Sequence, residues 1–68
     1  MHPVRRYRAK RALTIKDLEK RTGVAAGTIT RIELRQRTPR PITLHRLAEG
    51  LGVEIEDLTE YPEEKLAV

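Results

Sequence analysis

The apolar residues of this chain fall into short patches at helical spacing, with polar and turn-forming residues between them. Val4 and Tyr7 lie three positions apart, as do Ile29 and Ile32, and this spacing places two side chains on one face of a helix. No segment shows the strict alternation of apolar and polar residues that is typical of a half-buried strand. The pattern therefore predicts an all-α domain with Tyr7, Ile29 and Ile32 in its core.

Glycine, proline and capping residues divide this pattern into five predicted helices. Pro41 suits the first turn of a helix, because its φ is already helical and its missing N–H would be unpaired there. The predicted helices cover about residues 3–11, 15–22, 25–34 and 41–51, and a short stretch between Val53 and Leu58. Residues 61–68 contain a proline and two adjacent glutamates, so we expect a short flexible acidic tail after a domain of residues 1–60.

The second predicted helix carries the clearest boundary signals. Thr14 can accept a hydrogen bond from the backbone N–H of Asp17, while the Asp17 carboxylate accepts one from the backbone N–H of Thr14, which makes a capping box. Gly23 can adopt the left-handed conformation that ends a helix. The next helix begins only two or three residues later, so the two helices must cross at a large angle.

The fourth predicted helix should bury one apolar face. That face is expected to comprise Ile42, Leu44, Leu47, Ala48 and Leu51. His45 lies off this stripe and should be an exposed surface residue. Gly52 is expected to end the helix, and Gly50 to weaken it by about 1 kcal/mol relative to alanine.

Basic residues are concentrated in the first two thirds of the chain. Residues 1–46 carry thirteen Lys or Arg and three acidic residues, a balance of +10, whereas residues 47–68 carry one Lys and seven acidic residues, a balance of −6. A basic segment of this density is either a solvated arginine-rich surface or a surface that attracts a polyanion. Because the chain has two tyrosines and no other aromatic residue, stacking on single-stranded bases is not expected, and double-stranded DNA fits better as the partner.

Several other classes of protein are not expected from these residues. The chain has no cysteine and two histidines, which is too few for a metal site of the usual kinds, and no cofactor is predicted. It contains no nucleophile paired with a base and no glycine-rich phosphate loop, so we expect that it is not an enzyme. No apolar run is long enough to span a bilayer, and we expect a soluble protein of the cytoplasm, associated with the nucleoid.

Four stretches, in the right order, resemble the Cro/C1-type helix-turn-helix of phage and bacterial regulators, also called the XRE family. They are Leu13-Thr14 with Leu18, Gly23-Val24, Thr28 to Glu33, and Leu47 to Val53, and the resemblance covers residues 4–58. It implies a compact five-helix bundle like that of lambda repressor, with the helix at about 25–34 placed in the major groove. It also implies a small transcription regulator with modest sequence specificity that binds DNA as a homodimer, which we expect to form through the fourth and fifth helices with Leu58 and Tyr61.

The resemblance and the helical register together name the candidate interface. The residues expected to contact bases are Ala25, Ala26, Gly27, Thr30 and Arg31. Those expected to contact phosphates are Lys16, Thr28, Arg35, Arg37, Thr38 and Arg40. Arg31 alone in the first set could form a bidentate pair with guanine, or it could instead hold a phosphate or an acid such as Asp17. The resemblance further implies that Arg8 and Glu33 form an internal ion pair.

The chain departs from the family pattern at four places. Ile15 stands where a glutamine that holds a phosphate is often found, so that phosphate contact is not predicted here. Glu19 stands where a small residue is usual, which predicts either slightly splayed helices or a Glu19 side chain turned outward toward Arg5 or Arg8. Arg35 replaces a glycine, which predicts a different helix end or a strained left-handed arginine. The Ala25-Ala26-Gly27 segment replaces polar residues that normally read bases, so few hydrogen bonds to bases are expected.

A second hypothesis follows from the small number of hydrogen bonds expected between this segment and DNA bases. The same fold could serve as a protein-interaction module, such as an antitoxin or a phage factor that docks on polymerase. In that case the acidic last third of the chain would bind a basic partner. The apolar residues expected to assist are Leu58, Tyr61, Leu66 and Val68.

Overall fold

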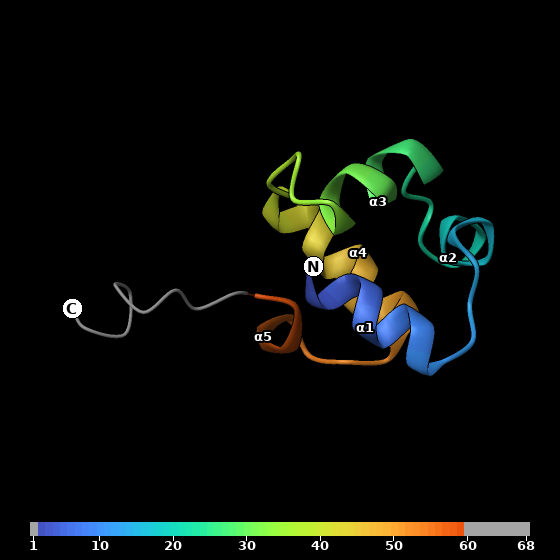
Figure 1. The fold of residues 1–68 in the computed structure, drawn as a ribbon. Helices are drawn as coiled ribbons and strands as arrows, with labels where there is room; N and C mark the ends of the chain where they lie inside the picture. The colour runs from blue at the N-terminus through green and yellow to red at the C-terminus, as the bar shows by residue number, and fades with distance from the viewer. Residues whose placement is uncertain (1, 60–68) are drawn as a thin grey trace.

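Five helices joined by short turns make up residues 2–59, the part of the chain that the structure, a computed structural model, describes (Figure 1). They are α1 (Pro3–Lys10), α2 (Ile15–Thr22), α3 (Ala26–Glu33), α4 (Pro41–Leu51) and α5 (Ile55–Leu58). No strand occurs within residues 2–59, so the predicted all-α class is confirmed. The tail predicted at 61–68 lies outside the described residues.

The core lies where α4 meets the other helices. Figure 1 shows α4 behind α1 and between α1 and α3, and α4 also contacts α2 and α5. The buried apolar residues are Val4, Leu18, Val24, Ile29, Ile32, Leu47, Ala48, Leu51 and Leu58. Tyr7 is only partly buried and packs against this cluster. Leu58 is fully buried, so it cannot contribute to a dimer contact or to a protein-docking surface as the sequence suggested.

Ile42 does not belong to the buried face of α4. Its exposed fraction is 57%, whereas Leu47 and Leu51 are almost completely buried. Each residue turns a helix by about 100°, so the nine positions between Ile42 and Leu51 place the two side chains about 180° apart. The prediction for Ile42 was therefore wrong.

Left-handed residues follow α1, α2, α3 and α4. Gly23 and Gly52 have φ values of 76° and 69°, as the sequence predicted, and Arg35 has a φ of 60°. The left-handed arginine expected from the missing glycine is thus present. Ala12, with a φ of 53°, gives α1 the same kind of end, and no signal in the sequence indicated it. Alanine and arginine at these positions carry the steric strain that glycine avoids.

Gly50 lies where α4 packs most closely against α2. A Cβ added at this position would meet Cγ2 of Thr22 far inside contact distance, and Cβ of Arg21 at 3.5 Å. The guanidinium Nη1 of Arg21 also donates a hydrogen bond of 3.4 Å to the carbonyl oxygen of Gly50. Glycine therefore allows the two helices to approach closely at this crossing, whereas the sequence alone presented it only as a weak point in the helix.

Candidate nucleic-acid interface

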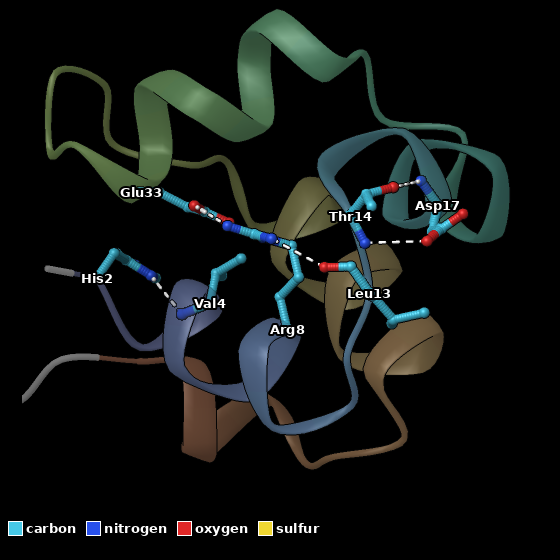
Figure 2. Close-up of polar contacts among 7 residues, drawn as sticks. All are labelled: His2, Val4, Arg8, Leu13, Thr14, Asp17 and Glu33. Atoms are coloured by element: carbon cyan, nitrogen blue, oxygen red, sulfur yellow. Dashed lines mark hydrogen bonds and ion pairs between the residues drawn. The ribbon is translucent and has the colours of Figure 1, made fainter.

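An ion pair between Arg8 of α1 and Glu33 of α3 fixes the last turn of α3. The Arg8 side chain donates from Nε to Glu33 Oε2 at 2.7 Å and from Nη2 to Glu33 Oε1 at 3.0 Å (Figure 2). Its Nη1 donates to the carbonyl oxygen of Leu13 at 2.8 Å. The Glu33 carboxylate raises the pKa of Arg8 above its ordinary value through these hydrogen bonds. The predicted ion pair is present, and it joins α1, the start of α2 and the end of α3.

His2 strengthens this junction in a way that the sequence did not indicate. Its Nδ1 accepts a hydrogen bond of 3.2 Å from the backbone N–H of Val4, which caps the first turn of α1 (Figure 2). Its own backbone N–H donates to the carbonyl oxygen of Glu33 at 3.2 Å. Histidine is not among the preferred capping residues, so no sequence signal pointed to this role. His45 is exposed, as predicted.

Side-chain hydrogen bonds fix both ends of α2, including the turn that leads to α3. The predicted capping box is present, with hydrogen bonds of 2.9 Å in both directions between Thr14 and Asp17 (Figure 2). The backbone N–H of Thr14 lowers the pKa of the Asp17 carboxyl below its ordinary value. At the other end, Thr22 Oγ1 donates to the carbonyl oxygen of Leu18 at 2.7 Å and accepts from the N–H of Val24 at 3.1 Å. These bonds fix the direction in which the chain leaves α2.

Glu19 caps the start of α3. Ala25 occupies the N-cap position and offers no side-chain hydrogen bond. The Glu19 carboxylate supplies it instead, because Oε2 accepts from the backbone N–H of Ala26 at 3.1 Å. Its Oε1 lies 3.8 Å from Nζ of Lys16. The predicted orientation toward Arg5 or Arg8 was wrong, because the free N–H groups at the start of α3 attract the carboxylate more directly.

The outward face of α3 carries the residues predicted to contact bases. Ala25, Gly27, Thr30 and Arg31 are exposed, and Ala26 is half-buried. Ile29 and Ile32 on the opposite face are completely buried, so the predicted register of this helix is confirmed. Within residues 2–59, the side chain of Arg31 forms no hydrogen bond or ion pair, so the alternative pairing of Arg31 with Asp17 does not occur there.

The residues predicted to contact phosphates lie near both ends of α3. Figure 1 shows α2 beside the start of α3, and the loop to α4 beyond its end. Lys16 in α2 is exposed, as are Arg35, Arg37, Thr38 and Arg40 after α3, whereas Thr28 within α3 is half-buried. The structure thus places exposed cations on either side of an unengaged helix face.

The model of a helix-turn-helix family matches residues 4–58 of this chain. The chain belongs to the Cro/C1-type helix-turn-helix family. It is therefore a DNA-binding domain of the kind found in transcription regulators. No solved structure matches the chain significantly.

Three similar proteins are named as transcription regulators of the same kind. The chain is 41% identical over 56 residues to the HTH-type transcriptional repressor RghR of Bacillus subtilis, which covers 81% of this chain but 42% of RghR. It is 37% identical over 59 residues to an uncharacterized HTH-type transcriptional regulator of Methanocaldococcus jannaschii, covering 87% of this chain and 89% of the relative. A similar regulator of Methanothermobacter thermautotrophicus is 39% identical over 56 residues, with 81% of each chain covered.

Two further findings concern the part of the chain that the structure describes. No helix there is long and apolar enough to cross a membrane. No group of three or more histidine, aspartate or glutamate side chains there could hold a metal ion.

Proposed function

We propose that this domain regulates transcription by inserting α3 into the major groove of double-stranded DNA. The observation that carries the proposal is the contrast between the two faces of α3. Ile29 and Ile32 are completely buried and Glu33 is held by Arg8, whereas Thr30 and Arg31 project from the outward face. A helix fixed at both ends and unengaged outside is the arrangement that a groove-reading helix needs.

Phosphate contacts would position the helix on the duplex. Lys16 at the start of α2 and the arginines between α3 and α4 are exposed and lie near opposite ends of α3. Cations placed in this way can hold the two DNA strands that border one groove. Thr28, Arg35, Thr38 and Arg40 are the further phosphate contacts of this proposal. Duplex binding would place the protein at the nucleoid, and no catalytic role is proposed.

Base contacts would be few. Arg31 is the one arginine on the outward face of α3, and Ala25, Ala26 and Gly27 offer methyl groups and backbone but no side-chain donors. Arginine pairs with guanine through two hydrogen bonds, and each such pair contributes about 1–3 kcal/mol of discrimination. We therefore propose modest specificity that depends on Arg31 together with Thr30.

A homodimer would supply a longer binding site. One recognition helix covers few base pairs, and two copies can read half-sites about one helical turn apart. Leu58 is buried, so the exposed sides of α4 and α5 remain for the contact, where Ile55 is 39% exposed. Tyr61 lies outside the described residues. The protein-interaction alternative is not favoured, because the matching family and the names of the similar proteins are those of transcription regulators.

Binding-site selection from random duplexes tests the assignment of Arg31. The Arg31→Ala variant should lose preference at one position in each half-site, whereas Arg37→Ala should keep the same preferred site. Arg37→Ala should instead weaken all duplexes similarly and lower the slope of log affinity against log salt by about 1. Arg46→Ala, an exposed arginine of α4, serves as the matched control. Equal stringency of the parent and Arg31→Ala would exclude direct reading by this residue.

A further inference from the structure

The outward face of α1 is a second basic surface of the domain. Arg5, Arg6 and Lys10 are exposed, Arg11 follows at the end of the helix, and α1 contains no acidic residue. Within residues 2–59 none of these four cations forms an ion pair, in contrast to Arg8. Four cations on about two turns are therefore left uncompensated.

This surface faces away from the recognition helix. Arg8 points from α1 toward Glu33 at the end of α3 (Figure 2). Arg6 and Lys10 each lie two positions from Arg8, and at about 100° per residue both are about 160° around the helix from it. Arg6 and Lys10 therefore lie on the side of α1 opposite the end of α3, whereas Arg8 itself is largely buried by its pair with Glu33.

The arrangement around Tyr7 shows that these cations are gathered together. The guanidinium carbons of Arg6 and Arg11 lie 5.4 and 5.8 Å from the centre of the Tyr7 ring, and Nζ of Lys10 lies 5.9 Å from it. Cation–π attraction offsets only part of the repulsion among like charges at exposed sites. Because the ring is half-buried beneath these side chains, it offers no open platform on which an unpaired base could stack.

We propose that Arg6 and Lys10 on the outward face of α1 bind the phosphate backbone of a second DNA duplex, so that one domain bridges two segments. The inference rests on the proposed function, in which α3 holds the first duplex. Double-stranded DNA fits this face because it carries one negative charge per about 1.7 Å of its axis, and a row of cations on a helix matches such a uniformly charged rod without requiring pockets. Binding here is independent of base sequence.

Capture of one duplex by another tests the proposal. A biotinylated duplex on beads is saturated with the full chain, and retention of a fluorescent duplex is measured over a range of salt concentrations. The Arg6→Gln/Lys10→Gln variant should lose capture, with the salt slope of capture lowered by about 2. The matched control is Lys20→Gln/Arg46→Gln, which removes the same charge from exposed positions of α2 and α4 and should retain capture.

Affinity for a single duplex, measured in parallel, separates the possible failures. The α1 variant should bind one duplex as tightly as the matched control does. Weaker single-duplex binding would place α1 in the same interface as α3 and overturn the proposal, as would equal capture by the two variants. A parent that binds one duplex but captures no second one refutes bridging and leaves the function of α3 intact. Capture of labelled polyglutamate in place of duplex would assign the face to an acidic protein instead.

Discussion

Replacing Gly50 with alanine should destabilise the domain, although alanine is the better helix former. The exchange gains about 1 kcal/mol of helix propensity. It also places a methyl group against Cγ2 of Thr22, and such overpacking costs about 1–3 kcal/mol. Thr22 cannot turn its methyl group away without breaking the bonds of its Oγ1 to Leu18 and Val24. We therefore expect a net loss of up to about 2 kcal/mol, which lowers Tm by up to roughly 16 °C in a domain of this size.

A double-mutant cycle followed by thermal unfolding measures this contact directly. Thr22→Ser removes Cγ2 but keeps Oγ1, so Gly50→Ala should become neutral or stabilising in that background, with a coupling energy of about 1–3 kcal/mol, equal to the overpacking cost. Gly27→Ala is the matched control, because nothing lies within 4 Å of a Cβ added there and only the propensity gain remains. If Gly50→Ala alone is at least as stable as the parent, the close approach of α2 and α4 is refuted.

Three other substitutions test separate features. In thermal unfolding, Ala12→Gly should raise the free energy of unfolding by about 0.5–1 kcal/mol, because it relieves a left-handed alanine. Ala9→Gly within α1 is the control and should lower it by about 1 kcal/mol. Equal effects of the two substitutions would show that residue 12 is unstrained. In denaturant unfolding, Glu33→Gln should lower the free energy of unfolding by about 2–3 kcal/mol, because Arg8 keeps its charge but loses the carboxylate that pairs with it. A smaller effect than the same change at an exposed glutamate would contradict the role of the pair. The pKa of the Asp17 carboxyl is lowered in the folded state, so the stabilisation it provides is present above about pH 4 and is lost as the pH falls further. Asp17→Asn should therefore reduce the fall of Tm at acid pH. Parallel curves of Tm against pH for the parent and this variant would show that the carboxylate does not stabilise the fold.

Local signals in the sequence predicted most of the helix boundaries. The Thr14–Asp17 box and the two left-handed glycines depend on residues that lie within four positions of each other, so their chemistry is visible without the fold. The Arg8–Glu33 pair spans 25 positions, and it was accessible only because the chain resembles a known family. The exposed residues of α3 followed from its register, which its two buried isoleucines determined.

Other features depend on contacts between distant helices, which a single sequence does not display. Gly50 is explained only by the position of Thr22 in α2, and Glu19 only by the uncapped start of α3. Ile42 lies on a helix whose apolar residues extend around more of its circumference than the core covers. His2 caps α1 although its residue type rarely does so. In each case tertiary packing decided between alternatives that local propensity left open.

The cap that Glu19 provides has a consequence for engineering. Many helices need Ser, Thr, Asp or Asn at the N-cap position, which restricts the side chains available there for contacts with a ligand. Here the cap comes from the preceding helix, and Ala25, Gly27 and Thr30 form no side-chain hydrogen bond within residues 2–59. These three positions can therefore be randomised in a library while the scaffold keeps its folding determinants. New operator preferences could be selected at these sites, provided that Glu19 is kept constant.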